Sequence, residues 1–471
     1  MFGIWDIKRA PSLTFYALHA LQHRGQQGAG IVSTERTRLR GYRNVGLLAD
    51  VFKDYEKLNK IDGTGALGAL WYSSKSSTNV HNIEPLLYKF NDGHLGIAMN
   101  GNLINARSLR DRLEDEGAVF HSESHAEIIM HLIRRSRKKT IYERFKEALT
   151  KLRGSFSVML LSENALFGAV DRHATRPLVL GKVQDSYALA SESCALNVIE
   201  GDFIRDISAG EIIRIDDDGY DIENFTEPSD IAIESMEFIY FARPDSTIMG
   251  KNVHIVRKNS GRVLAREAPV DADIVVGVPN SSLSLATGYA EEIGLPYEMG
   301  LIKNQYIGRT FIEPTQNLRD MKVKMKLSAL SDVVKNKRVI LLDDSIVRGT
   351  TSKRIITMLK DAGASEVHLR IGAPQIIFPS YSGIDMTRSK ELIAASYKKD
   401  ELRELIGADS LEFLSIDGLK EAVGFDFKTD NRGISLDIFN GDYIEGLSNL
   451  EEEFKENLTA IQKEYLEKGK R

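Results

Sequence analysis

The segment from Arg338 to Ser352, RVILLDDSIVRGTTS, constrains the fold of this chain more than any other part of the sequence. Val339 to Leu342 is an apolar run flanked by charged residues, which is typical of a strand buried on both faces of a parallel sheet. Asp343 and Asp344 follow at its carboxyl end. Ligands of open α/β sheets bind outside these strand ends, so the two carboxylates are placed for a sugar diol and its Mg²⁺.

A loop of small residues and hydroxyls comes next, with Ser345, Gly349, Thr350 and Thr351 ahead of a helical pattern from Ser352 to Leu359. Backbone N–H groups at such a loop and helix start hold a phosphate dianion. The alternative is an ordinary strand and turn, in which the acids cap a helix and the glycine supplies a turn conformation. That reading requires the apolar run, the acid pair and the loop to coincide by accident.

The segment resembles the motif of type I phosphoribosyltransferases, and its wording is similar to that of the amidophosphoribosyltransferase family, the glutamine amidotransferases that act on phosphoribosyl diphosphate (PRPP). The likeness extends along most of the chain. It includes FYALHALQHRGQQGAGIV (Phe15 to Val32), MNGNLIN (Met99 to Asn105), FARPDS (Phe241 to Ser246), GVPNSS (Gly277 to Ser282), KNQYIGRTFI (Lys303 to Ile312) and ASEVHLRIGAP (Ala364 to Pro374).

The resemblance implies an α/β protein with two parts. An αββα sandwich like that of N-terminal nucleophile hydrolases would carry the glutaminase, and a type I phosphoribosyltransferase α/β domain would follow it. The implied reaction forms 5-phosphoribosylamine and pyrophosphate, the first committed step of purine synthesis. It also implies Mg²⁺ as the cofactor and a homotetramer as the assembly.

Composition is consistent with this assignment. The chain has 471 residues, enough for two cores or more, and its net charge of -5 gives no basic surface for nucleic acid. No apolar stretch approaches the ~20 residues of a membrane span, and the start lacks a secretory core, so we expect a cytoplasmic protein. The single cysteine, Cys194, cannot supply an iron–sulfur cluster of the kind that some family members carry. We expect it to be a small buried side chain.

The chain divides near residues 226–231, where TEPSDI follows the acidic turn DDDG. Upstream, short runs such as Phe156 to Leu161 and Tyr187 to Ala190 alternate with turn signals, as in stacked sheets. Downstream, Ile274 to Val278 and Val339 to Leu342 each precede a loop and a helical pattern, which indicates a parallel sheet. We therefore predict a glutamine amidotransferase domain over residues 1–228 and a phosphoribosyltransferase domain over 229–445.

The last segment, residues 446–471, is predicted to form one amphipathic helix that packs on its own chain or on a sister subunit. Its apolar residues recur at helical spacing: Leu447, Leu450, Phe454, Leu458, Ile461 and Tyr465.

A second phosphate-binding turn is expected at Pro279 to Ser282, between the strand that ends at Val278 and a helix running to about Glu292. In the family this turn holds the pyrophosphate, and the resemblance places Ser281 near the Mg²⁺ with Asp343 and Asp344. Ser281 and Ser282 match the family pattern, whereas Asn280 replaces an acid, so we expect altered rather than lost binding. The simpler reading of Ser281 is a helix N-cap.

Lys303 to Ile312 is similar to the family's mobile lid, which closes over PRPP and excludes water. Lys303, Tyr306 and Arg309 are its candidate catalytic residues, with the two cations facing the leaving pyrophosphate. Gln305 stands where the family usually has an arginine, so one cation is lost. The alternative is a solvated surface loop.

The amino-terminal half departs from the family. Family members begin with a cysteine whose thiol attacks glutamine and whose α-amine is the base. Here Met1 and Phe2 precede Gly3, and neither carries a nucleophilic side-chain atom, although residues upstream of the assigned start could supply one.

Two further departures do not depend on the start. Trp71, in ALWYSS, replaces the arginine that grips the α-carboxylate of glutamine, and His125, in ESHAEI, replaces the aspartate that takes its α-ammonium group. Each loss of a desolvated charge partner costs about 2–5 kcal/mol, so together they would weaken glutamine binding by several powers of ten.

Other glutaminase residues persist. Arg24 matches the family arginine, and Asn100 with Gly101 matches the pair that forms the oxyanion hole. With the nucleophile missing, the structural reading is favoured: Arg24 holds the domain together, and Asn-Gly makes a tight turn. His19, His23 and His131 show no metal-ligand spacing, so core or surface roles are expected.

Three hypotheses follow. The favoured one is a transferase that uses PRPP and free ammonia and whose glutaminase site is vestigial. The second is a glutamine-dependent enzyme with an upstream cysteine and altered contacts. The third is a PRPP-binding pseudoenzyme that regulates, or assembles with, a complete paralogue; Asn280 and Gln305 favour it, and the intact acids oppose it.

Overall fold

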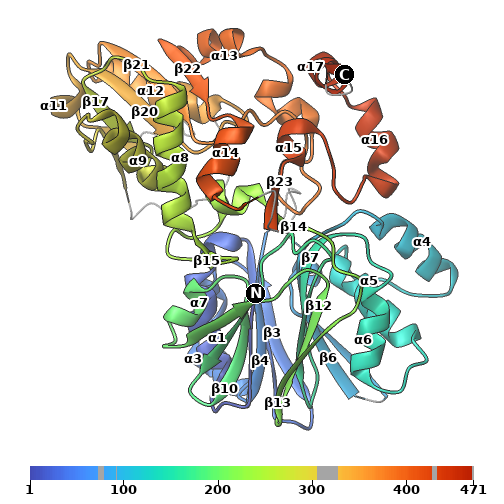
Figure 1. Ribbon diagram of the computed structural model, residues 1–471. Coiled ribbons are helices and arrows are strands. Elements are labelled where there is room, and N and C mark those ends of the chain that lie inside the picture. Colours follow the sequence, from blue (N-terminus) through green and yellow to red (C-terminus); the bar gives the residue numbers. More distant parts are fainter. Residues whose placement is uncertain (73–78, 92, 305–326, 427–431, 469–471) are drawn as a thin grey trace.

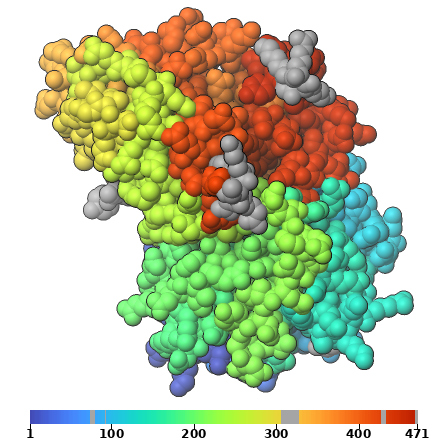
Figure 2. All heavy atoms as spheres, viewed as in Figure 1, coloured from blue at the N-terminus to red at the C-terminus, as the bar shows by residue number. Residues whose placement is uncertain are grey.

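The computed structural model describes residues 1–72, 79–91, 93–304, 327–426 and 432–468. Two stacked masses make up the molecule: the amino-terminal half, coloured blue to green, and the carboxyl-terminal half, coloured yellow to red (Figures 1 and 2). Within the described residues, no helix combines the length and the apolar character that crossing a bilayer requires.

Two antiparallel sheets face each other in the amino-terminal half (Figure 1). The seven-stranded sheet has the order β11 (Asp202–Asp206), β9 (Val179–Val183), β10 (Ser186–Ala190), β1 (Phe2–Trp5), β4 (Gly65–Trp71), β2 (Gly28–Thr34) and β3 (Leu39–Val45). The six-stranded sheet has the order β13 (Gly219–Asn224), β12 (Glu211–Asp216), β8 (Leu166–Val170), β7 (Gly154–Leu161), β6 (Gly93–Leu103) and β5 (Leu86–Phe90). The runs expected to be strands at 156–161 and 187–190 are confirmed as β7 and β10.

Helices cover the outer face of each sheet, which gives the expected αββα sandwich (Figure 1). The seven-stranded sheet is covered by α1 (Ala10–Ala20), α2 (Leu48–Val51), α3 (Tyr55–Lys60) and α7 (Cys194–Asn197). The six-stranded sheet is covered by α4 (Ala106–Asp115), α5 (His125–Arg135) and α6 (Ile141–Leu149). Leu67, Met159 and Leu189 are fully buried between the sheets. Every residue of β7 is buried because both of its faces are covered.

The carboxyl-terminal half is built on a four-stranded parallel sheet in the order β17, β20, β21, β22. The strands are β17 (Ile274–Gly277), β20 (Arg338–Asp343), β21 (Glu366–Ile371) and β22 (Ser410–Phe413), and the surrounding helices are α8 (Val253–Glu267), α9 (Leu283–Ile293), α11 (Ser331–Val334), α12 (Thr350–Asp361), α13 (Lys399–Ile406) and α14 (Ile416–Val423). The expected strands at 274–278 and 339–342, and the helices after them, are confirmed. The apolar run of β20 is buried, as a central parallel strand requires.

Shorter elements join the two halves. Strand β14 (Ile231–Glu234) pairs in parallel with β23 (Arg432–Ser435), and β14 leads into a π-helical turn, η3 (Glu237–Phe241). The two-stranded pairs are β15 (Thr247–Ile248) with β16 (Lys251–Asn252) and β18 (Leu301–Lys303) with β19 (Leu327–Ala329). The boundary expected at residue 228 lies between β13 and β14 and stays a prediction.

The carboxyl-terminal segment differs from the single helix expected over 446–471. After α15 (Asp437–Asn440), the chain forms a 3₁₀ turn, η6 (Ser448–Leu450), and then two helices, α16 (Glu451–Glu456) and α17 (Ala460–Lys468). The break has a local cause: Thr459 and Gln462 exchange hydrogen bonds, with Thr459 N–H donating to Gln462 Oε1 at 2.8 Å, and this capping pair starts a new helix. The expected packing on its own chain is confirmed, since Phe454 is buried beside Phe378.

Candidate active site

A cavity of about 880 Å³ lies at the junction of the two halves. From the carboxyl-terminal half it is lined by predicted site residues Ser281, Asp343, Asp344, Ser345, Gly349, Thr350 and Thr351. From the amino-terminal half it is lined by the predicted glutaminase residues Arg24, Trp71, Asn100, Gly101 and His125. Two sets of residues that the sequence assigned to separate reactions therefore share one space.

The acid pair sits where β20 ends. Asp343 and Asp344 are each only 8% exposed, and hydroxyl groups surround them. Ser282 Oγ donates to Asp343 Oδ1 at 3.2 Å, and Ser345 Oγ donates to Asp344 Oδ1 at 2.7 Å. Burial, followed by the charge of Asp344, raises the pKa of Asp343 well above its usual range, and burial also raises the pKa of Asp344. A pair of this kind favours a hard cation, which would offset the repulsion.

The phosphate loop has the conformation that its sequence predicts. Gly349 is the N-cap of α12 with φ 72°, in the left-handed region that favours glycine. A Cβ at this position would also lie 2.6 Å from Ile393 Cδ1. Thr350 and Thr351 open the helix and are exposed toward the cavity that they line. Their backbone N–H groups lie at a helix start, where an anion is stabilised.

The second turn is only partly as expected. Ser281 lines the cavity, but Ser282 is fully buried beneath it and serves Asp343 instead. Asn280 is exposed. Of the lid residues, Lys303 lies at the exposed end of β18 and is not among the residues lining the cavity, and Tyr306 and Arg309 lie outside the described residues, as does Gln305.

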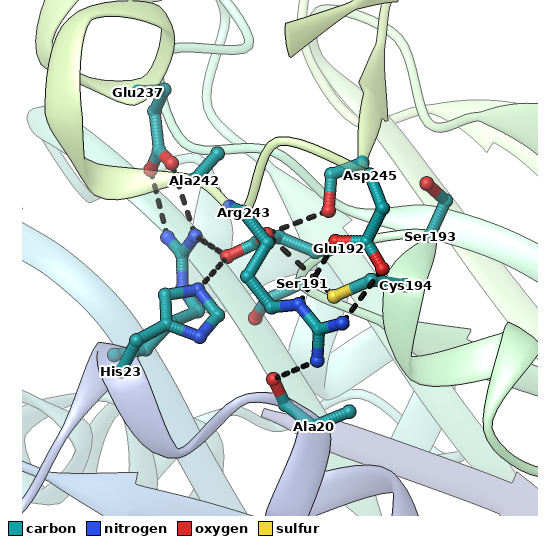
Figure 3. A network of polar contacts seen from close by, with 12 residues as sticks. Ala20, His23, Ser191, Glu192, Ser193, Cys194, Glu237, Ala242, Arg243 and Asp245 are labelled. Atoms are coloured by element: carbon teal, nitrogen blue, oxygen red, sulfur yellow. Dashed lines mark hydrogen bonds and ion pairs between the residues drawn. The ribbon is translucent and has the colours of Figure 1, made fainter. Parts of the chain in front are cut away.

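Figure 3 shows a buried ion network at the amino-terminal wall of the cavity, with His23, Glu192 and Glu237 among its labelled residues. Arg24 belongs to this network. Its guanidinium donates to Glu192 Oε1 at 2.6 Å and to Glu237 Oε1 at 2.7 Å, and its side chain is 5% exposed. Burial opposes its charge, but Glu237 and Glu192 raise the pKa of Arg24 above its ordinary value. Glu192 also accepts from Arg243 N–H at 2.9 Å and contacts His23 Nε2 at 2.6 Å. Arg24 is therefore fully engaged in holding two acids of different segments.

Asn100 and Gly101 do not form the tight turn that their dipeptide suggested. They lie within β6 and pair with Ser157 and Phe156 of β7. Gly101 has φ 127°, and a Cβ there would lie 2.0 Å from Ser155 O, so the strand geometry itself requires glycine. The turn interpretation was wrong because the pairing partner is more than fifty residues away in the sequence.

Arg176 supports Asn100 from behind. Its Nη2 donates to Asn100 Oδ1 at 3.2 Å and lies 3.3 Å from Glu237 Oε1. The side chain is 1% exposed, and neither its Nε nor its Nη1 has a partner among the described residues. Asn100 Nδ2 is likewise without one among these residues.

His125 presents a donor where an acceptor is expected. It is the first residue of α5, and its Nδ1 accepts the Leu103 N–H at 3.1 Å. A neutral imidazole whose Nδ1 accepts must carry its hydrogen on Nε2, so the ring cannot replace a carboxylate. One nearby acid is Glu84, which accepts from Met99 N–H at 2.6 Å and from Ser124 Oγ at 2.5 Å. Burial raises the pKa of Glu84 to about 7, which weakens it as a permanent anion.

Trp71 ends β4 at the mouth of the cavity, and the residue after it joins the two halves. Tyr72 Oη donates to Asp385 Oδ2 at 2.9 Å. Gly383 packs directly on the Gly101 backbone, because a Cβ on Gly383 would lie 2.7 Å from the Gly101 Cα. At this edge of the cavity the two halves are therefore joined by backbone contacts as well as by side-chain contacts.

Sequence reasoning missed several residues at this site, among them Glu84, Arg176, Glu192 and Glu237. All four are charged side chains that are at least nine-tenths buried. A carboxylate or guanidinium inside an apolar segment is a signal, because such groups are buried almost only when paired. Glu237 in SMEFIYF and Glu192 in ASESCA carry that signal.

The expectation that Cys194 is a small buried side chain is confirmed. Cys194 is fully buried, and burial together with the charge of Glu192 raises the pKa of its thiol to about 12. The described residues contain no cluster of three or more acids, histidines and cysteines that would hold a metal ion. His23 was expected to have only a core or surface role, but it lines the cavity and contacts Glu192.

A buried acid cluster lies behind the cavity segment 383–386. Ser382 Oγ donates to Glu234 Oε2, and Ser435 Oγ donates to Asp437 Oδ1 at 2.8 Å. Glu234 and Ser435 are register partners on β14 and β23, which places the two carboxyl groups close together. Glu234 Oε1 has no partner among the described residues. Burial, followed by the charge of Asp437, raises the pKa of Glu234 to about 8.

Glu234→Gln is expected to increase stability above neutral pH. The native state retains a proton that the unfolded chain releases above pH 4.5, so the stability from this group is fully present below pH 4.5 and is lost as the pH rises through about 8. Glutamine cannot ionise, so the variant should be about 1–3 kcal/mol more stable than the parent at pH 8. The free energy of unfolding is measured at about pH 4.5 and at pH 8 by urea titration, with circular dichroism as the signal. The exposed Glu227→Gln is the control, and an unchanged pH dependence in Glu234→Gln would contradict the assignment.

Two domain families match the chain: the glutamine amidotransferase domain over residues 75–198 and the phosphoribosyl transferase domain over residues 251–371. The amidophosphoribosyltransferase of Staphylococcus aureus (strain MRSA252) is 53% identical over 472 residues, which is 100% of this chain and 95% of that protein. The chain belongs to the amidophosphoribosyltransferase family.

Other members of the family agree. The amidophosphoribosyltransferase of Bacillus subtilis (strain 168) is 47% identical over 94% of this chain and 93% of that protein. The solved structure of B. subtilis glutamine PRPP amidotransferase, complexed with ADP and GMP, has a TM-score of 0.90 at 46% identity and covers 95% of this chain and 97% of its own. The resemblance and the fold class are thereby confirmed. The chain is a transferase of purine biosynthesis, of the pentosyltransferase type that the family represents.

Proposed function

We propose that this enzyme forms 5-phosphoribosylamine and pyrophosphate from PRPP with ammonia as the nitrogen donor, and that its glutaminase site is vestigial. One observation supports the proposal: the acid pair and the phosphate loop share a cavity with Trp71 and His125, which stand where the family resemblance leads us to expect an arginine and an aspartate. PRPP binding follows from the first half of that observation, and the preference for ammonia follows from the second.

The acids and the loop divide the work on PRPP. Asp343 and Asp344 would fix the ribose hydroxyls, and the N–H groups at residues 349–351 would hold the 5′-phosphate. The new bond joins nitrogen to the anomeric carbon, the bond from that carbon to the pyrophosphate oxygen breaks, and the surplus ammonia proton leaves to solvent. The protein contributes mostly position and electrostatics. The lid residues Lys303, Tyr306 and Arg309 remain predicted participants.

The residues present fit Mg²⁺. This ion prefers oxygen ligands, keeps several waters, and is usually bound by one or two carboxylates together with substrate phosphates. Asp343, Asp344 and Ser281 offer such oxygens, and the buried like-charged acids favour a cation between them. When bound, Mg²⁺ would offset charge on the leaving pyrophosphate.

Loss of glutamine use is supported by two side chains. Trp71 has a single N–H and no charge, so it cannot replace a bidentate guanidinium. His125 is held as an Nε2–H donor by Leu103, and a donor repels the α-ammonium group that an aspartate would accept. Arg24, Asn100 and Gly101 are retained, but each has a structural partner that accounts for it.

Pyrophosphate release from PRPP and Mg²⁺ tests the proposal directly. With ammonium chloride the enzyme is expected to turn over, whereas with glutamine kcat/KM should be lower than that of a typical glutaminase by roughly two powers of ten or more. Equal turnover with glutamine would show that an upstream cysteine and altered contacts sustain the glutaminase. PRPP binding without turnover would identify a regulatory pseudoenzyme, which could act with a complete paralogue.

A matched pair of variants separates lost contacts from other causes. Trp71→Arg with His125→Asp should restore glutamine binding, seen as heat in titration calorimetry, whatever residue precedes Met1. The same double variant should leave ammonia-dependent turnover unchanged within about twofold, since neither side chain touches PRPP in the proposed arrangement. A folded double variant that still ignores glutamine would contradict our account of the pocket.

The assembly and location remain expectations. The family resemblance implies a homotetramer, and the composition favours the reducing cytoplasm. Sedimentation of the purified enzyme would test the first of these.

A further inference from the structure

Arg257 is a buried cation that the proposed reaction does not use. It lies in α8, on the face that also buries Val253, Val256 and Ser260, and it is 5% exposed. A guanidinium is rarely buried unless its donors are satisfied. Its partners therefore indicate what it does.

The Arg257 guanidinium donates its hydrogen bonds to backbone carbonyls of one short turn. Arg257 Nε donates to Phe238 O at 2.7 Å, and Nη2 donates to Ala242 O at 2.8 Å and to Glu237 O at 3.5 Å. These carbonyls belong to η3 and its C-cap, where a helix end leaves acceptors without partners. The planar fork of arginine can serve several of them at once, whereas a lysine ammonium is a point charge.

The turn that Arg257 binds forms part of the cavity wall. Met236, Tyr240 and Phe241 line the cavity. The Glu237 side chain reaches the other way to Arg24, whose guanidinium also lies over the Phe241 ring at 4.5 Å. The wall is thus held from the amino-terminal half by Arg24 and from the carboxyl-terminal half by Arg257.

The charge of one transferase acid also reaches Arg257. Burial lowers its pKa, and the strongest opposing influence is the charge of Asp344, ahead of Glu192 and Glu237. The same helix rises from the junction of the two halves (Figure 1). The hydrogen bonds of this one side chain therefore connect the wall of the cavity with α8.

We propose that Arg257 is a positioning residue of the transferase reaction, which ties the turn Glu237–Phe241 to α8 and so keeps the Tyr240–Phe241 wall closed against water. The inference rests on the proposed function, because it concerns whether ammonia or water meets PRPP. A loosened wall admits water, which replaces nitrogen at the anomeric carbon and yields ribose 5-phosphate and pyrophosphate.

The partition between amine transfer and hydrolysis is the measurement. For the wild type, Arg257→Lys and Arg262→Lys, pyrophosphate release is compared with phosphoribosylamine formation at saturating PRPP, Mg²⁺ and ammonia. Arg257→Lys should raise the hydrolysed fraction roughly tenfold. Arg262 is the matched control: it lies on the same helix, its side chain is 38% exposed, and it pairs with Glu291 at 2.8 Å. Its lysine variant should retain the wild-type partition.

Each outcome decides the inference. A wild-type partition in folded Arg257→Lys overturns it, and so does an equal loss of both products, which would indicate general destabilisation. If Arg257→Lys does not fold, Tyr240→Ala decides instead, since Tyr240 is 50% exposed and its removal opens the wall without emptying the core; an unchanged partition in this variant also overturns the inference. If the wild type uses glutamine rather than ammonia, the proposed function fails, yet the partition is still measurable with glutamine.

Discussion

Asp344→Asn is expected to lower kcat/KM for PRPP by about 10²- to 10³-fold, because it removes one of the two charges that would hold Mg²⁺ and the sugar in the proposed site. Stability should move in the opposite direction. Asp344 lies beside Asp343 with both groups buried, and burial raises the pKa of each, so a neutral amide relieves repulsion in the folded state. The variant should therefore melt at the same temperature or higher while losing activity.

Steady-state kinetics with varied PRPP and Mg²⁺, combined with a thermal melt, measures both effects. Asp271→Asn is the control, since Asp271 is an exposed carboxylate that pairs with Arg338 at the opposite end of β20. Its activity should match that of the parent. An Asp344→Asn enzyme with full activity would remove the acid pair from the proposed site.

Arg24→Met should reduce the free energy of unfolding by about 3–5 kcal/mol, since it leaves Glu192 and Glu237 buried with much of their charge uncompensated. Both acids are fully buried, and in the variant Arg176 would still lie 3.3 Å from Glu237 and His23 would still lie 2.6 Å from Glu192. Urea unfolding followed by tryptophan fluorescence is a suitable probe, because the two tryptophans of the chain, Trp5 and Trp71, both lie in the seven-stranded sheet that adjoins this network.

Arg36→Met provides the comparison. Arg36 binds Asp6 and Asp217 at the surface, with exposed fractions of 57% and 59% for the two acids, and such pairs contribute about 1 kcal/mol or less. If Arg24→Met proved as stable as Arg36→Met, a structural role for Arg24 would be untenable and a catalytic one would regain support.

The transferase half could be predicted closely because its signals are local. The run in β20, the acids after it and Gly349 before α12 all lie within fifteen residues, and each has a physical reason to occur in that order. A strand covered on both faces must be apolar throughout, and a helix start that binds phosphate must leave its N–H groups open. Constraints of this kind can be recognised in a short run of consecutive residues.

The glutaminase half was predicted less well because its decisive contacts are distant in sequence. Arg24 meets Glu237 across 213 positions, and Tyr72 meets Asp385 across 313. The spacing of apolar residues along the sequence does not indicate which distant residues form such pairs. The tight turn expected at Asn100 failed for the same reason, since strand pairing with β7 overrides the local preference of an Asn-Gly dipeptide. In the last segment a local signal was present but overlooked: Thr459 and Gln462 have the spacing of a capping pair.

The contact between Gly383 and Gly101 bears on how freely the two halves could be exchanged among relatives. Each position tolerates only a hydrogen, since a Cβ on Gly383 would lie 2.7 Å from the Gly101 backbone and a Cβ on Gly101 would lie 2.0 Å from Ser155 O. A chimera joining the sandwich of one homologue to the phosphoribosyltransferase half of another would need glycine on both sides of the seam. Recombination at this junction is thus constrained by two missing side chains as well as by complementary pairs such as Tyr72 with Asp385.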